Sequence, residues 1–311
     1  MNQDVMNCPA CGRVSPTARA VCMYCGTLLP VTRIETAPHQ RQIDNSELAF
    51  NTVIDTSRTR VDEQTENAFA SALQMEPSEA RGFLVTGKRV PVSRSLTRVE
   101  AELIAALMRT CGIGATVIAD EDMKLDTDLT RARRITRNPG HLQIHHSTGE
   151  ITVALSEIRL MVVGSLRGSR VDYTEGLSRS NGASGSLVDT SEFRSDEMLV
   201  DVYANNLDQS FRMKADGFDY SGLVRPLSFR AEVNFRSAIA AIQGSAPHAI
   251  IDDEFPRLRG LLSRAWPQRS RLESRGFKRA GIGFRSVAQA SVISDNREQF
   301  DRYSRLMFLT M

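Results

Sequence analysis

The sequence predicts a multidomain α+β protein: a small metal-bound module, a compact α/β sandwich, and a β-rich, barrel-like domain capped by a helix. Three observations lead to this prediction. The first thirty residues hold two Cys-x-x-Cys motifs, helix starts alternate with short apolar runs over residues 66–125, and several strand patterns precede one amphipathic helix over residues 138–247. A length of 311 residues suits two or three such units.

Composition excludes several classes of protein. The chain has 39 Lys and Arg against 37 Asp and Glu, a net charge of +2, which argues against a strongly basic chain and against an acidic disordered one. The N-terminus has neither the basic nor the apolar region of a signal peptide, and no stretch of about 20 apolar residues is present. With the cysteine pattern, which requires reduced thiols, this predicts a cytoplasmic location.

Four cysteines, Cys8, Cys11, Cys22 and Cys25, are typical of a structural metal site. Each Cys-x-x-Cys turn aims two sulfurs at one point, and two such turns ten residues apart can close a tetrahedral tetrathiolate site. Zinc is the expected metal, with iron as its competitor. Residues 1–30 therefore resemble a zinc ribbon. Since four thiolates leave no open position, we expect the metal to be structural, while the partner of the ribbon (nucleic acid, protein or none) stays open.

Residues 31–65 predict a flexible linker. The segment is polar, and Phe50 is its only aromatic residue. Such a composition buries too little apolar surface to offset the entropy of the chain, so we expect a tether between the ribbon and the rest.

Residues 66–125 predict a small α/β docking domain. The expected elements, in order, are a strand over 69–73, a helix that begins at Pro77, an edge strand over 89–93, a helix over 101–108 and a buried strand over 115–119. Thr97 and Glu100 form a capping box before the second helix, and Gly112 follows its end. Cys111, at that end, is interpreted as a small buried apolar residue.

Short motifs in this domain resemble the C-terminal domain of the bacterial ribosomal stalk protein and the adaptor family of the Clp protease. The motifs are Glu79-Ala80-Arg81, Ser95-Leu96-Thr97, Glu100-Ala101-Glu102 and Cys111-Gly112, spread over about fifty residues. The resemblance implies a surface that docks proteins and no catalysis. The Lys-rich helix with which the stalk domain engages translation factors is missing here, so that role is not implied.

Residues 138–247 predict the β-rich domain. Hairpins are expected over 142–155 and 198–215, with apolar strands over 158–163 and 169–173 and a Gly/Ser-rich loop over 176–186. An amphipathic helix over 232–242 follows. This order of elements resembles a pleckstrin-homology-like barrel capped by its helix, a fold whose members bind phosphoinositides or peptides, and fold alone does not settle function.

No catalytic residue is predicted. His145 and His146 are adjacent on an expected strand and therefore point to opposite faces, which favours a structural or solvent-facing role over metal binding. The acidic run at 252–254 is typical of a helix start. Phosphate-binding glycine loops, nucleophile elbows and zinc-protease motifs are missing from the sequence.

Residues 248–311 carry a basic segment and a C-terminal helix. Residues 257–285 have a net charge of +8, which leaves −6 for the remainder of the chain. The candidate residues for an anionic partner (nucleic acid, an acidic protein or a membrane surface) are Arg264, Arg269, Arg271, Arg275, Lys278 and Arg279. The alternative is that these side chains neutralise acidic groups of the same chain. Apolar residues at helical spacing predict a helix over 297–309.

Two functions follow from these patterns. The first is a non-enzymatic cytoplasmic scaffold, in which a zinc ribbon and two docking domains gather protein partners. The alternative is a nucleic-acid-associated regulator that uses the ribbon and the Arg-rich segment. A net charge near zero favours the first. The chain as a whole also resembles uncharacterised bacterial zinc-ribbon proteins, which implies no activity, and its oligomeric state stays open.

Overall fold

The computed structural model describes residues 5–16, 24, 25, 27, 43, 47–180, 183–279 and 286–311. Within these residues the chain is mixed α/β and forms two compact units, Met1–Asp122 and Met123–Met311. Over the same residues, no helix is both long enough and apolar enough to cross a lipid bilayer.

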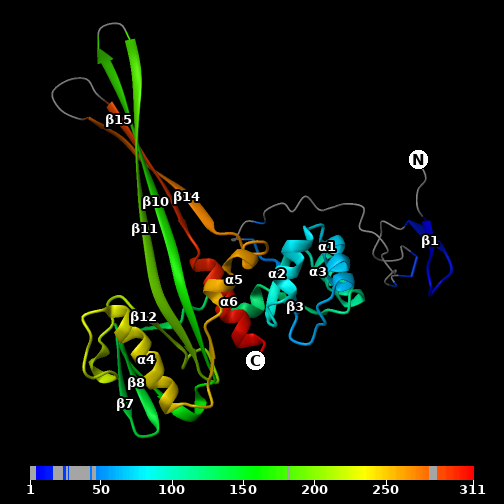
Figure 1. The fold of residues 1–311 in the computed structure, drawn as a ribbon, viewed down its shortest axis with the longest axis horizontal. Helices are drawn as coiled ribbons and strands as arrows, with labels where there is room; N and C mark the ends of the chain where they lie inside the picture. The colour runs from blue at the N-terminus through cyan, green and yellow to red at the C-terminus, as the bar shows by residue number, and fades with distance from the viewer. Residues whose placement is uncertain are drawn as a thin grey trace. The chain divides into compact units, whose positions relative to one another are not determined.

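Unit 1 begins with a short antiparallel hairpin and continues into an α/β domain (Figure 1). The hairpin strands are β1 (Val5–Asn7) and β2 (Val14–Pro16). The domain follows as β3 (Phe50–Asp55), α1 (Glu63–Leu73), α2 (Pro77–Leu84), β4 (Arg89–Ser95), α3 (Arg98–Thr110) and β5 (Gly114–Ala119). Its sheet has the order β4-β3-β5, and both neighbours of β3 run antiparallel to it.

Helix α3 has the caps that the sequence predicts and is longer at both ends than the expected range 101–108. The Thr97 hydroxyl accepts a hydrogen bond from the Glu100 amide at 3.3 Å, which satisfies one amide of the first turn. Cys111 caps the other end, and Gly112 follows with a φ of +76°, a left-handed conformation that glycine adopts without strain. Strand β4 is an edge strand, as its proline indicates, and the predicted start of α2 at Pro77 is also confirmed.

Two predictions for this domain are wrong. The expected strand over 69–73 is the second half of α1, whose cap is Asp62: its carboxylate accepts from the Thr65 amide at 2.9 Å. The segment 31–65 is not a linker throughout, because β3 lies in it and forms the centre of the sheet. Composition misled here, since Asn51 and Thr52 are polar but buried and hydrogen-bonded.

Unit 2 contains an open sheet and a separate three-stranded sheet. The open sheet has the order β14-β15-β10-β11-β12-β6, with β13 paired to the start of β10, and the smaller sheet has the order β7-β8-β9. The strands are β6 (Thr130–Ala132), β7 (Arg134–Asn138), β8 (His141–His146), β9 (Gly149–Ala154), β10 (Leu160–Ser180), β11 (Ala183–Tyr203), β12 (Phe211–Lys214), β13 (Ile250–Asp252), β14 (Arg269–Arg279) and β15 (Ser286–Asp295). The helices are α4 (Ala231–Ser245), α5 (Phe255–Leu262) and α6 (Arg297–Leu309).

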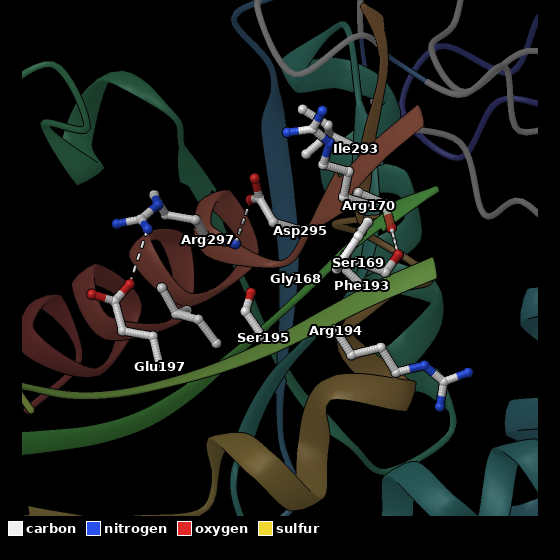
Figure 2. A pocket seen from close by; sticks show the side chains of 12 residues that line it. Gly168, Ser169, Arg170, Phe193, Arg194, Ser195, Glu197, Ile293, Asp295 and Arg297 are labelled. Atoms are coloured by element: carbon white, nitrogen blue, oxygen red, sulfur yellow. Dashed lines mark hydrogen bonds and ion pairs between the residues drawn. The ribbon is translucent and has the colours of Figure 1, made fainter. Parts of the chain in front are cut away.

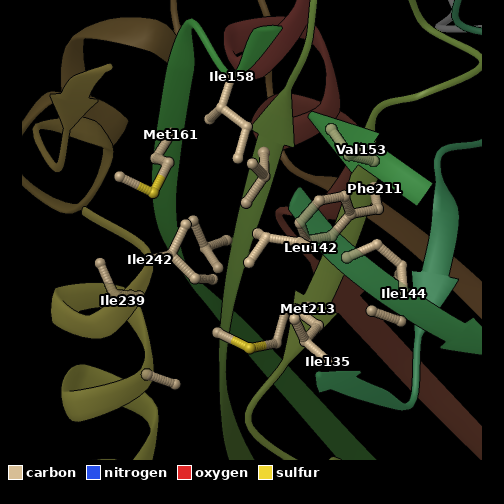
Figure 3. Close-up of a cluster of buried hydrophobic side chains, with 14 of the residues drawn as sticks. Ile135, Leu142, Ile144, Val153, Ile158, Met161, Phe211, Met213, Ile239 and Ile242 are labelled. Atoms are coloured by element: carbon tan, nitrogen blue, oxygen red, sulfur yellow. The ribbon is translucent and has the colours of Figure 1, made fainter. Parts of the chain in front are cut away.

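The core of unit 2 has two halves, one on each side of β10 and β11. On one side, apolar side chains from the β7-β8-β9 sheet, β12 and α4 converge on Met161 and Val202 (Figure 3). On the other side, α5 and α6 cover Leu160, Val162 and Leu166 with large buried rings. The rings of these two helices are Phe255, Phe300 and Tyr303, and Trp266, which follows α5, is also fully buried. The predicted helices over 232–242 and 297–309 are therefore confirmed as α4 and α6.

The expected barrel is wrong, since neither sheet of unit 2 closes in the described residues. The predicted Gly/Ser-rich loop over 176–186 is also wrong: β10 and β11 stay paired, without a register shift, from Leu160 opposite Tyr203 to Ser180 opposite Ala183. The two strands leave the core and continue as a long hairpin, and β14 and β15 join it along β10 (Figure 1).

Candidate metal centre and the arm of unit 2

The first Cys-x-x-Cys turn sits at the tip of the β1–β2 hairpin. The Gly12 amide donates to the Cys8 carbonyl at 2.9 Å, and the Cys8 amide donates to the Arg13 carbonyl at 2.9 Å. Gly12 has a φ of +70°, so the turn needs a residue without a side chain at this position. This local geometry turns Cys8 and Cys11 toward the same side.

Three thiols meet at this turn. The sulfurs of Cys8, Cys11 and Cys25 all lie within 4.8 Å of one another, and Cys8 Sγ is 3.6 Å from Cys25 Sγ. Sulfurs about 2.3 Å from a tetrahedral zinc are about 3.8 Å apart, so the donor atoms fit such an ion. Cys8 is buried, whereas Cys11 and Cys25 are exposed. The predicted fourth ligand, Cys22, lies outside the described residues.

Two neighbours support the cluster. Cys25 Sγ is 3.3 Å from Thr27 Oγ1, so this hydroxyl can donate a hydrogen bond to a thiolate. The Arg13 guanidinium lies 4.9 Å from the centre of the Tyr24 ring, which links the two cysteine turns. The fifth cysteine is different. Cys111 is half-buried and not fully buried as predicted, and burial raises its pKa, which disfavours the alternative of a reactive thiol.

The second feature is the arm of unit 2, which we define as residues 168–180 of β10, 183–196 of β11, and all of β14 and β15. At the usual rise per residue, β10 alone runs about 40 Å beyond Gly168. Residues that are opposite one another in the ladder share a face. We call the face that carries Phe193 the first face and the face that carries Leu272 the second face. One row across the first face consists of Phe193, Arg170, Ile293 and Arg271. The adjacent row, on the second face, consists of Glu192, Val171, Val292 and Leu272.

Both faces of the arm expose large apolar side chains. Phe193 on the first face is 58% exposed, and Leu272 on the second is 70% exposed. Tyr173, one row further along the second face, is 40% exposed, and Val171 and Val292 between them are half-buried. The side chains of Val171, Tyr173, Leu272 and Val292 form what we call the apolar strip of the arm.

A hollow of about 350 Å³ lies where the first face meets the core (Figure 2). Gly168 helps to form it, because a Cβ at this position would come within 2.7 Å of Ser195 Oγ. Its charged groups are paired: Arg297 donates to Glu197 at 3.0 Å, and Arg170 donates to Asp172 at 2.7 Å. Because these pairs already satisfy one another, the hollow has the character of a surface groove more than of a catalytic site.

The six predicted anion-binding residues lie in two segments of unit 2. Arg264 is half-buried just after α5, while the other five lie on β14. Arg269 pairs with Glu298 and Arg271 pairs with Glu273, so acidic groups of the same chain neutralise part of the positive charge. The side chains of Arg275, Lys278 and Arg279 lie outside the described residues, and binding of an anionic partner stays a prediction.

A buried ionic cluster under α6 was not predicted. Arg212 donates to both oxygens of Asp201, at 2.6 and 2.8 Å, and to Asp301 at 2.6 Å, while the Ser304 hydroxyl also donates to Asp201. Burial works against the charge of Arg212, but the two carboxylates outweigh it and raise the pKa of Arg212. Burial raises the pKa of Asp301. The sequence contains one indication of this cluster: Asp201 is the only charged residue in the apolar run 198–203, and a carboxylate buried there needs a partner.

A second buried ion pair lies in unit 1, between Arg94 on β4 and Asp120 directly after β5. Arg94 donates to Asp120 at 2.5 Å, both side chains are almost fully buried, and Arg94 also donates to the carbonyls of Glu47 and Ile43.

The two histidines of β8, for which the sequence disfavours metal binding, have partners close by in the sequence. His145 contacts Glu150 at 2.6 Å, and His146 contacts Thr148 at 3.2 Å.

Comparison of the chain with protein-family models, with curated proteins and with solved structures gave no match. The resemblances to the stalk protein, the Clp adaptors and the pleckstrin-homology-like fold therefore rest on the sequence motifs alone.

Proposed function

We propose that this chain is a non-enzymatic interaction protein of the cytoplasm, in which the arm of unit 2 binds a protein partner and the cysteine cluster holds a structural zinc ion. The observation that carries the proposal is the apolar strip of the arm. Its side chains project from a sheet that extends past the core, so their apolar character contributes little to the stability of unit 2.

The chemistry of the strip favours a protein segment over nucleic acid. Tyr173, Leu272 and their two valine neighbours offer aromatic and aliphatic surface, and the nearest charged residue in the same rows, Glu192, pairs with Arg194 at 2.9 Å. Interfaces between proteins are enriched in such aromatic side chains, whereas nucleic-acid contacts need positive charge, which the four residues of the strip do not carry.

Zinc suits the cysteine cluster because three thiolates at tetrahedral spacing are soft ligands, and Cys22 would supply the fourth. Bound there, the ion would contribute folding free energy to a segment too small to fold on apolar burial alone. Cys8, Cys11 and Cys25 would hold it, and Gly12 keeps the first turn in the conformation that brings the thiols together.

The partner is tested by site-specific crosslinking in the full chain. A benzoylphenylalanine that replaces Tyr173 should crosslink to protein in a nuclease-treated host lysate, and the same amino acid in place of the fully exposed Phe229, outside the arm, should not. Leu272→Ser should reduce the yield at position 173 severalfold. Equal yields at positions 173 and 229, or crosslinks that disappear with nuclease, would contradict the proposal.

A second candidate is a nucleic-acid-associated regulator, because Arg269 and Arg271 lie two residues apart on exposed β14 and so share a face. If this is correct, the chain binds DNA or RNA with a steep salt dependence, and the double variant Arg269→Ala/Arg271→Ala lowers the slope of log K against log salt by about 2. Binding that is weak and insensitive to salt would exclude this function.

A further inference from the structure

The outer half of β11 has a neighbouring strand on one side only. β11 pairs with β10 along its whole length, but β12 covers its other edge only from Leu199 to Val202. Among the residues that the structure describes, the backbone groups on that edge from Thr190 to Glu197 therefore face no second strand, and pairing with the β12 side begins at Met198, whose carbonyl accepts from the Ala215 amide at 2.8 Å. An edge strand of this length is a ready template for another strand.

The opposite edge of the arm, β14, is protected in ways that β11 is not. β14 has a register shift between Ser274 and Gly276, a bulge that interrupts pairing, and its exposed residues are rich in arginine. β11 has no register shift against β10, and the segment 190–197 has a net charge of −2, with Arg194 as its one basic residue. The two edges of one sheet are thus unequal, and the β11 edge is the one that can accept a partner.

The sequence of this edge is complementary to itself. In an antiparallel pair of identical strands, a two-fold axis normal to the sheet places each residue opposite a residue of the same face. The axis therefore lies midway between one residue and the same residue of the second chain, and we name the axis after that residue. With the axis at Phe193, that ring faces its own copy, Glu192 faces Arg194 of the second chain, and Ser191 faces Ser195.

These pairs match the exposure of the side chains. Phe193 is 58% exposed, while the side chains of Glu192 and Arg194 are 46% and 81% exposed and lie on the opposite face. An axis at Glu192 or at Arg194 would instead place like charges opposite each other. The alternative axis at Ser195 would set the Phe193 ring against Glu197, whose carboxylate already binds Lys214 and Arg297.

We infer that two copies of this chain associate through antiparallel pairing of β11, with the two-fold axis at Phe193, so that the arms of two chains form one continuous sheet. This inference goes beyond the proposed function, because it needs only a second copy of the chain and leaves both faces of the arm open to another partner.

Charge reversal tests the pairing. In analytical ultracentrifugation of the purified full chain, wild type should form dimers, whereas Glu192→Arg and Arg194→Glu should each weaken association at least tenfold, because like charges then face each other twice. The double variant should dimerise as wild type does. An equimolar mixture of the two single variants should form heterodimers, since Arg at position 192 then faces Glu at position 194.

Glu232→Arg is the matched control, because it reverses one charge of an exposed ion pair on α4 (Glu232–Arg236, 2.7 Å) away from the arm. It should leave association unchanged. Circular dichroism checks that each variant keeps its fold. Wild type that stays monomeric at all concentrations, dimers that survive both single variants, or a mixture that stays monomeric would overturn the inference.

Cysteine substitution tests the register. Phe193→Cys should give a disulfide-linked dimer under mild oxidation beyond the wild-type background, and Ser195→Cys should do so only when mixed with Ser191→Cys. Crosslinking of Ser195→Cys alone would overturn the axis at Phe193. These experiments use purified protein, so their failure is separate from failure of the lysate crosslinks at position 173.

Discussion

A glycine on β10 makes the packing of α6 open to a quantitative test. Gly164 lies under the Phe300 ring, and a Cβ at this position would stand 2.3, 2.6 and 2.9 Å from three ring carbons. Carbon atoms pack best at about 3.5–4.0 Å, so Gly164→Ala forces the ring to retreat by about 1 Å or more. The ring has little room to do so, since it is fully buried against Phe255 (5.0 Å between centres) and lies 5.4 Å from the Arg212 guanidinium.

The expected cost follows from two opposing effects. Overpacking of this kind costs about 1–3 kcal/mol, and the contact here is at the severe end. Replacing a strand glycine by alanine recovers up to about 1 kcal/mol of backbone entropy. We therefore expect Gly164→Ala to lower the free energy of unfolding of unit 2 by about 2 kcal/mol.

Urea unfolding followed by tryptophan fluorescence measures this change. Trp266 is the only tryptophan of the chain, it is buried beside α6, and its carbonyl accepts from Gln299 at 2.9 Å, so its emission reports on this half of the core. Gly260→Ala in α5 is the matched control: a Cβ there meets open space, and helix propensity predicts a gain of up to about 1 kcal/mol.

A stability of Gly164→Ala within about 0.5 kcal/mol of wild type would refute the packing argument. The clash is assigned to the ring by a double-mutant cycle with Phe300→Leu, whose smaller side chain relieves it. The two substitutions should then be less than additive by about 1 kcal/mol or more, since contacting residues couple by this amount.

The remaining predictions concern the metal, a carboxylate and a strand. Cys8→Ser/Cys11→Ser should lose the zinc that wild type binds at about one ion per chain, measured by plasma mass spectrometry, with the unfolding of unit 2 unchanged; retention of zinc would exclude the cluster as its site. For Glu197, burial tends to raise the pKa, but Lys214 and Arg297 outweigh it and lower the pKa below the ordinary 4.5. Its contribution to stability is thus present above pH 4.5 and is lost as the pH falls through the lowered pKa. Glu197→Gln should therefore destabilise unit 2 at neutral pH and progressively less as the pH falls below 4.5, and a pH-independent difference in urea titrations would contradict this. Asn51→Ala should cost about 1–3 kcal/mol in thermal unfolding, because it removes the amide that donates to buried Asp120 at 2.8 Å, and a neutral effect would argue against β3 at the centre of the sheet.

Elements with local signals could be predicted from the sequence. The hydroxyl of Thr97 caps α3 within three residues, and the glycine after Cys11 shapes the first cysteine turn within four. Helix α6 shows its buried face in the spacing of Phe300, Tyr303 and Leu306. In each case the residues that decide the structure are neighbours in the sequence.

Elements that depend on distant partners were missed. Asn51 becomes acceptable in a buried strand only because Asp120, 69 residues later, accepts its amide hydrogens. The arm is the clearest case, since residues 176–180 have a loop-like composition and are strands because of the strands beside them. The β11 edge shows no pattern of a binding site in the sequence, because its complementarity appears only when the strand is paired with its own copy.

The order of strands in the arm also determines when each strand pair can form during synthesis of the chain. β10 and β11 are consecutive and can pair as soon as both leave the ribosome, but β15 reaches β10 only when residues up to Asp295 have emerged, about ninety residues after the end of β11. At about 5–20 residues per second this takes about 5–20 seconds. During this interval the hairpin has two uncovered edges, so a nascent chain that stalls before β14 exposes β10 to neighbouring chains and is the form most prone to aggregate.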